Sequence, residues 1–104
     1  MKQSRSILEF RRQFGVPAQF KFAGFVICNM HKEDYLFKYS GESSNALFSQ
    51  WTPSPEFSLK FSRYKLASDV IDSFEWHDKA AVLIAFENRK QIAVCEIPSD
   101  FLLE

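Results

Sequence analysis

The first pattern along the chain is that of a helix, over residues 6 to 14. Its apolar residues recur at intervals of three and four: Ile7, Phe10 and Phe14. Ser6 and Glu9 have the spacing of a capping box, in which the serine hydroxyl accepts a hydrogen bond from the amide three residues later. Gly15 and Pro17 follow and predict that the helix ends there after about two turns.

The period then changes to two, which is typical of β-strands. Between residues 20 and 30, one face is expected to hold Phe20, Phe22, Val26, Cys28 and Met30. The other face is polar at first and apolar later, so this strand is expected to be buried increasingly on both sides. The polar residues 31–34 predict a hairpin loop into a second strand over 35–39, and a third strand is expected over 46–51.

A second helix is expected over residues 63 to 75. Its apolar residues have helical spacing: Leu66, Ala67, Val70, Ile71 and Phe74. Ser62 is the expected cap, with Phe61 and Leu66 forming a hydrophobic staple across it. Alternating apolar residues at 57–61 indicate a short strand or an extended entry before this helix. Apolar runs at 80–86 and 91–97 predict two strands after it, and both look central because apolar residues occupy both of their faces.

The resulting element order, α-β-β-β-(β)-α-β-β, predicts an α+β fold. Loops of hairpin length imply antiparallel pairing. We therefore expect an antiparallel sheet of four to five strands with two helices, with a helix packed on one sheet face. The chain of 104 residues contains no repeat or linker, so residues 1–104 are expected to form a single globular domain.

Composition narrows the class of protein. The apolar fraction is 46% and the 13 Lys and Arg balance the 13 Asp and Glu, so neither a disordered chain nor a uniformly basic nucleic-acid binder is expected. The apolar run at 80–86 is far shorter than the roughly 20 residues of a membrane-spanning helix. The first residues have no apolar signal segment. A cytoplasmic protein without membrane contact is therefore expected.

The sequence offers no motif for catalysis, a cofactor or a metal ion. Cys28 and Cys95 form no CxxC, and a single disulfide between them is one alternative. Both lie in apolar runs, which favours two buried free thiols. His31 and His77 lack the spacing of metal ligands and are interpreted as solvated loop residues. No serine lies in a GxSxG elbow, and the glycines are isolated, which disfavours a phosphate-binding loop. We expect a protein that is not an enzyme.

The surplus of aromatic residues points to a binding surface. The chain has 12 Phe, 3 Tyr and 2 Trp, more than a core of this size accommodates. Trp51 and Trp76 stand beside breaks in the pattern, where exposed rings would anchor a partner, although packing over helix ends explains them equally well. Acidic side chains lie on one flank of the second helix and at its end: Asp69, Asp72, Glu75 and Asp78. They either imitate the phosphates of a nucleic acid toward a basic channel of a partner protein or simply form a solvated face.

In size, cap chemistry and lack of a catalytic signature, the chain resembles small accessory proteins of phages and mobile elements, anti-CRISPR proteins included. The resemblance implies a non-enzymatic protein-binding module that inhibits a host nuclease or defence complex by steric occlusion or charge mimicry. Its partner would be a host protein or protein complex. A homodimer is a further hypothesis, because central-looking strands and spare aromatic residues could pair across a two-fold axis.

The alternative is a nucleic-acid-binding protein or a small metal-independent RNase that uses the basic N-terminal segment. The candidate phosphate contacts are Arg5, Arg11, Arg12 and Lys21. Residues that bracket the second helix could serve the RNase: Arg63, Tyr64, Lys65 and His77. A solvated helix face explains the arginines without any nucleic acid. The charges also divide along the chain, because residues 1–65 carry ten Lys and Arg against five Asp and Glu, whereas residues 66–104 carry three against eight.

Overall fold

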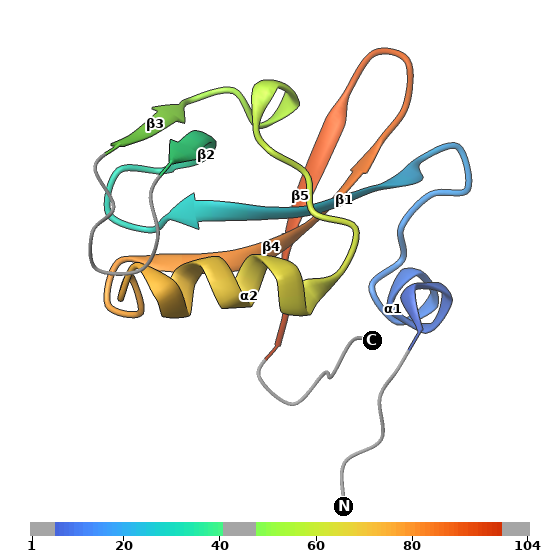
Figure 1. The fold of residues 1–104 in the computed structure, drawn as a ribbon. Helices are drawn as coiled ribbons and strands as arrows, with labels where there is room; N and C mark the ends of the chain where they lie inside the picture. The colour runs from blue at the N-terminus through green and yellow to red at the C-terminus, as the bar shows by residue number, and fades with distance from the viewer. Residues whose placement is uncertain (1–5, 41–47, 99–104) are drawn as a thin grey trace, which may run out of the picture.

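Five antiparallel strands form one sheet in the order β3-β2-β1-β4-β5, and two α-helices complete the part of the chain that the structure describes, residues 6–40 and 48–98. The structure is a computed structural model. Its elements are α1 (Ile7–Gln13), β1 (Lys21–Asn29), β2 (Asp34–Ser40), β3 (Phe48–Thr52), the short 3-10 helix η2 (Pro55–Phe57), α2 (Tyr64–Ser73), β4 (Ala80–Glu87) and β5 (Ile92–Glu96). The α+β fold predicted from the sequence is confirmed, with α2 running alongside β4 (Figure 1).

Helix α1 forms where the cap and the apolar stripe predict it. The Glu9 amide donates to the Ser6 hydroxyl at 3.2 Å, which satisfies one of the amides that the first turn leaves without a partner. Phe10 is fully buried and is the anchor of this short helix. Its ring lies 6.0 Å from that of Phe86 on β4, so α1 is held by packing against the sheet rather than by its own length.

A bulge in β1 reverses the two faces of the strand. The register with β4 shifts between Phe22 and Gly24, so Phe22 packs with Phe25 and Ile27 in the cluster beneath α2. The predicted grouping of Phe22 with Val26 and Cys28 is therefore wrong. A bulge inserts one residue into the alternation, and side chains on either side of it exchange faces.

Residues 59–61 fill a gap between β1 and β2. The two strands pair only at Cys28 with Tyr35 and at Asn29 with Asp34, and they then diverge. In the gap, the Leu59 amide donates to the Leu36 carbonyl at 2.9 Å. The backbones of Phe25 and Phe61 exchange two hydrogen bonds of 2.8 Å.

Of the two alternatives for residues 57–61, the short strand is wrong, and an extended entry into α2 describes the residues that follow η2. The segment is the 3-10 helix η2 followed by one isolated bridge, from Phe61 to Phe25. Pro55 lies at the start of η2, where its missing amide costs no hydrogen bond and its fixed φ favours a helical turn.

Helix α2 begins one residue later than expected, at Tyr64. Arg63 is the extended N-cap residue and its side chain makes no capping bond, so the prediction of Ser62 as the cap is wrong. Ala67 and Ile71 face the sheet and are buried. Leu66 is 47% exposed, because one residue turns a helix by about 100° and carries it out of the buried stripe. The hydrophobic staple that assumed the Ser62 cap is thereby lost.

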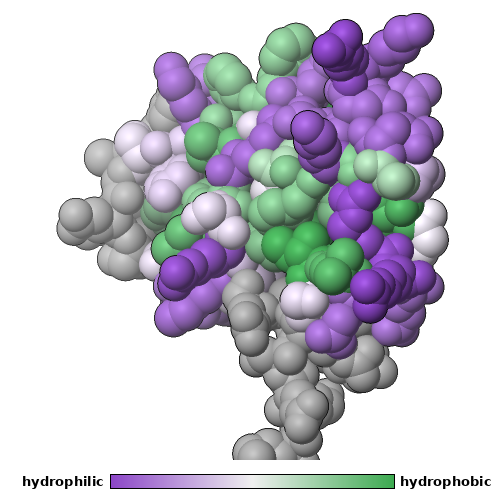
Figure 2. Space-filling view, turned by 90° about the vertical axis from the view of Figure 1, so that its right-hand side faces the viewer, coloured by the Kyte–Doolittle hydropathy of each residue, from purple (hydrophilic) through white to green (hydrophobic). Residues whose placement is uncertain are grey.

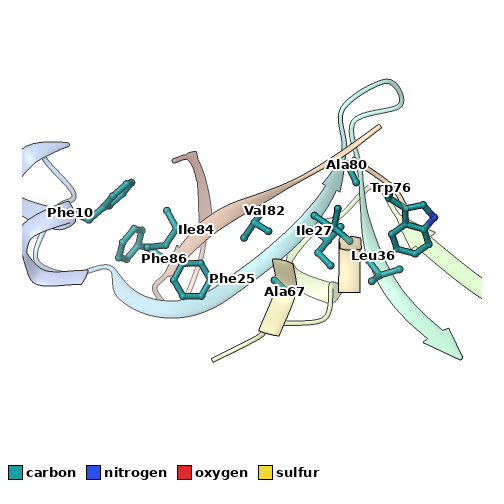
Figure 3. Close-up of a cluster of buried hydrophobic side chains, with 11 residues drawn as sticks. Phe10, Phe25, Ile27, Leu36, Ala67, Trp76, Ala80, Val82, Ile84 and Phe86 are labelled. Carbon is teal, nitrogen blue, oxygen red and sulfur yellow. The ribbon is translucent and has the colours of Figure 1, made fainter. Parts of the chain in front are cut away.

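The larger core cluster lies between the sheet and the two helices. It runs along β1 and β4 from Phe10 at one end to Trp76 at the other, with Ala67 of α2 near its middle (Figure 3). A smaller cluster occupies the opposite face of the sheet and consists of Val26, Cys28, Leu83 and Ala85. Among the described residues, no helix is long and apolar enough to cross a membrane.

The two cysteines lie on opposite faces of the sheet. Cys28 belongs to the smaller cluster, whereas Cys95 packs against the larger one beside Ile84. Both thiols are free, and Cys28 is buried as predicted, while Cys95 is half-buried. Burial raises the pKa of both thiols above the ordinary value of 9.0, and carboxylates led by Asp34 add to the effect at Cys28.

This burial predicts a loss of stability in alkaline solution. The folded protein keeps both thiols protonated at a pH where the unfolded chain releases those protons. The stabilising contribution is therefore complete below pH 9.0 and is lost as the pH rises through the raised pKa values. Urea unfolding at pH 8 and pH 10 should show a lower free energy of unfolding at pH 10. The Cys28→Ala variant should show a smaller decrease, and an equal decrease would contradict this cause.

Candidate nucleic-acid interface

An open cleft of about 720 Å³ lies where β1 begins and the β4–β5 turn closes. Its lining residues are Gln19, Lys21, Phe22, Glu87, Asn88, Arg89 and Lys90. Lys21 is the first residue of β1 and lies directly opposite Glu87, the last residue of β4. Antiparallel pairing thus brings the basic N-terminal segment beside a turn that is 66 positions away in the sequence.

The β4–β5 turn is fixed by the side chain of Asn88. Its Oδ1 accepts hydrogen bonds from the amides of Lys90 and Gln91, both at 2.8 Å. The Asn88 amide donates in turn to the Gln91 carbonyl at 2.9 Å. This arrangement is an Asx turn, in which the side-chain oxygen of asparagine accepts from the amide two residues later. The turn places Arg89 and Lys90 at an exposed tip beside Lys21.

The cleft carries an excess of positive charge. Three of its side chains are cationic, and Glu87 is its only carboxylate. Lys21, Arg89 and Lys90 form no ion pair, because the only ion pair of a lysine or arginine found among residues 6–40 and 48–98 is Lys65 with Asp69. Three cations that converge without paired carboxylates favour the binding of an anion.

The arginines of α1 contribute unequally to this basic end of the molecule. The guanidinium of Arg11 lies 5.3 Å from the centre of the Phe86 ring and donates to the Pro17 carbonyl at 3.1 Å. Arg11 is therefore engaged in holding α1 to the sheet. Arg12 is exposed in the last turn of α1. Arg5, the remaining candidate from the sequence, lies outside the described residues.

A second cleft of about 450 Å³ adjoins the first and shares Lys90 with it. It is lined by Phe20, Pro53, Ser54, Pro55, Glu56, Lys90, Gln91, Ile92 and Ala93. Figure 2 shows the side of the molecule that carries α1 and the β4–β5 turn. Strongly hydrophilic groups gather in its upper part, above an apolar area (Figure 2). The two clefts together form a surface that offers both charge and apolar contact.

The predicted acidic residues are all exposed, but two of them have partners. Lys65 Nζ lies 3.2 Å from Asp69, and His77 Nε2 donates to Asp72 Oδ1 at 2.6 Å. Glu75 and Asp78 are exposed at the exit of α2, where no side-chain partner is found among the described residues. Lys65 therefore offsets the negative charge of Asp69, while Asp72 is engaged in a hydrogen bond with His77.

The two tryptophans differ in their surroundings. Trp76 is 9% exposed and packs against Phe74, with ring centres 4.9 Å apart, so of the two alternatives the structure shows packing over the helix end rather than an exposed ring. Its amide donates to the Ile71 carbonyl, and this tight exit from α2, with Glu75 at a φ of 56°, turns the ring into the core. Trp51 is half-buried on the edge strand β3, 5.3 Å from Trp76 between ring centres.

The residues considered for an RNase do not converge. Arg63, Tyr64 and Lys65 lie at the start of α2, and His77 follows its end. A helix of ten residues spans about 15 Å, so His77 and these residues lie at opposite ends of it. Among the described residues, no three side chains of His, Cys, Asp or Glu group in a way that could hold a metal ion.

Sequence reasoning missed Arg89 and Lys90, which line the cleft with Lys21. They lie between the two strands predicted at 80–86 and 91–97, and the only signal for their role is the antiparallel order that brings the end of β4 to the start of β1. Comparisons with known protein families, curated proteins and solved structures gave no match for the chain.

Proposed function

We propose that this chain is a non-enzymatic, cytoplasmic protein that binds single-stranded nucleic acid through the cleft at the start of β1. The observation that carries the proposal is the convergence of Lys21, Arg89 and Lys90 on one cleft with no ion pair to neutralise them. Phosphate groups are the anions that such a set of cations recognises most readily in a biological polymer.

The dimensions of the cleft favour a polymer segment over a single small anion. A volume of about 720 Å³ is in the range that accommodates ligands of drug or nucleotide size. Phe22 contributes aromatic surface to the lining, and Phe20 contributes it to the adjoining cleft. A basic groove interspersed with aromatic side chains is typical of sites that bind single strands without reading their sequence.

The proposal predicts a specific change in salt dependence. Binding of a fluorescent 12-nucleotide single strand should be followed by anisotropy at several salt concentrations. Each phosphate contact to a single strand contributes a slope of about −0.7 to the plot of log affinity against log salt. The double variant Lys21→Gln/Arg89→Gln should therefore bind more weakly at low salt, with a slope shallower by about 1.4.

The matched control removes the same charge elsewhere. Lys32 and Lys38 are exposed lysines of the β1–β2 hairpin and do not line the cleft. The variant Lys32→Gln/Lys38→Gln should retain the slope of the unchanged protein. If the slope of log affinity against log salt becomes equally shallow in both double variants, the nucleic acid binds by non-specific electrostatic attraction to the whole surface rather than in the cleft. If the unchanged protein gives no anisotropy signal at low salt, the proposal fails.

A second candidate is the protein-binding module that inhibits a host nuclease or defence complex, in the manner of anti-CRISPR proteins. It is supported by the exposed carboxylates of Glu75 and Asp78, which have no side-chain partner among the described residues. These groups would occupy part of a basic nucleic-acid channel by charge mimicry. This candidate expects no anisotropy signal from nucleic acid, and it expects inhibition of the target to weaken in the variant Glu75→Gln/Asp78→Asn.

A further inference from the structure

Strand β5 lies at the edge of the sheet although it has the composition of a central strand. Its side chains are apolar on both faces: Ile92 and Val94 pack toward the smaller cluster, and Cys95 packs toward the larger one. Edge strands in monomers usually carry a charge, a proline or a bulge that prevents further pairing. Residues 92 to 95 have none of these, and Glu96 is the first charged residue of the strand.

The hydrogen bonds of the hairpin show which groups of β5 point outward. The Asn88 amide donates to the Gln91 carbonyl, so residues 88 and 91 form a hydrogen-bonded pair. Such pairs alternate along an antiparallel ladder, which makes the pairs 86–93 and 84–95 hydrogen-bonded as well. Ile92, Val94 and Glu96 therefore direct their N–H and C=O groups away from β4. No backbone partner for these groups is found among the described residues.

We propose that two copies of this chain pair through their β5 edges, antiparallel, around a two-fold axis at Ala93. An antiparallel pair of identical strands is self-complementary, as a two-fold interface requires. Ile92 then lies opposite the partner's Val94, and both backbones use their outward groups. The two sheets become one continuous sheet of ten strands, five from the described part of each copy. This inference does not depend on nucleic-acid binding.

Charge complementarity selects this register. With the axis at Ala93, Lys90 of the turn before β5 comes near the partner's Glu96 at both ends of the pairing, where the two opposite charges attract each other. The two neighbouring registers with the same hydrogen-bond phase have their axes at Ile92 and at Val94. The axis at Ile92 places Lys90 opposite the partner's Val94. The axis at Val94 places Ile92 opposite the partner's Glu96, so in neither register do the two charges meet. The register at Ala93 matches apolar with apolar and acid with base.

The side chains of β5 suit pairing about this axis. Ala93 is small, so the axis position brings no bulky side chains against each other. Ile92 and Val94 are half-buried in the single copy, and pairing covers more of their apolar surface.

A disulfide across the axis tests the register directly. In this register, the two Ala93 residues of the dimer lie opposite each other. They form a non-hydrogen-bonded pair, with Cα atoms about 4.5 Å apart. That separation lies within the range of a disulfide, which is about 4.4 to 6.8 Å. The variant Ala93→Cys/Cys95→Ser should therefore form a covalent dimer under mild oxidation. The control Gln91→Cys/Cys95→Ser should not, because residue 91 faces the partner's residue 95. Equal cross-linking of the two variants would overturn the register.

Sedimentation of the unchanged protein provides the second test. We expect a species of about twice the monomer mass of 12.1 kDa. Lys90→Glu and Glu96→Lys should each weaken the dimer at least tenfold, and the double variant Lys90→Glu/Glu96→Lys should restore it. Both residues are exposed, so folding is retained and is checked by circular dichroism. A monomer at 100 μM, or a charge-exchanged variant no tighter than the single ones, would overturn the proposal.

Discussion

Replacing Trp76 by alanine is expected to lower the free energy of unfolding by about 3–5 kcal/mol. The ring is 9% exposed and closes one end of the larger core cluster, where it contacts the rings of Trp51 and Phe74. Its removal leaves a cavity at the point where α2 turns into β4. Because Lys79 Nζ lies 5.3 Å from the ring centre, a cation–π contact is lost as well.

Urea unfolding followed by far-ultraviolet circular dichroism measures this change. Trp51→Ala is the matched control, because Trp51 is half-buried on the edge strand β3 and should lose less stability. If Trp76→Ala unfolds at the same urea concentration as the unchanged protein, the ring does not support the core. Trp76 would then regain its role as a candidate anchor for a partner.

The second large effect is expected at Gly24, in the bulge of β1. Its φ of +141° is a conformation that residues with a Cβ rarely adopt. A Cβ at this position would also lie 2.9 Å from the Cβ of Lys60 and 3.0 Å from the carbonyl oxygen of Phe61. Backbone strain of about 1–3 kcal/mol and overpacking of about 1–3 kcal/mol act together. We expect Gly24→Ala to lose roughly 3 kcal/mol of stability.

Gly15→Ala separates the two causes. Gly15 also has a positive φ, +65°, but a Cβ there would meet no atom within 4 Å. Only the strain of the left-handed conformation remains, which is about 1–2 kcal/mol. Measured by the same urea unfolding, a loss for Gly24→Ala no greater than that for Gly15→Ala would show that the close approach of residues 60 and 61 is tolerated.

The spacing of apolar residues and the capping residues in the sequence were sufficient to predict the two helices, each of which buries one face. The cap at Ser6 and the spacing of the apolar residues predicted α1, and the stripe around Ala67 and Ile71 predicted α2. The bulge at Gly24 was not predictable in this way, because a glycine in a strand is compatible with regular alternation until the approach of another segment is known. Likewise, residues 59–61 alternate like a strand, and their neighbours β1 and β2 decide that only one bridge forms.

The candidate site depends even more on tertiary structure. Composition shows a net charge of zero, and the sequence halves show opposite signs. The fold distributes the charges differently, because the start of β1 and the β4–β5 turn place cations from both halves in one cleft. The acidic side chains of α2 and its exit lie in segments that do not line this cleft. The division of charge along the sequence therefore does not identify the residues that form the basic cleft, because these come from both halves.

The pairing of β1 with β4 has a consequence for how the chain acquires its structure during synthesis. The pairs of this ladder join residues 51 to 66 positions apart, from Asn29 with Ala80 to Lys21 with Glu87. Ladders between such distant segments close slowly, because a long loop must be ordered before any contact compensates for its entropy. During translation, the apolar residues of β1 therefore cannot pair with β4 until residues 80–87 have been synthesised. During that interval a nascent chain exposes an aggregation-prone strand, and chaperones are its natural protection.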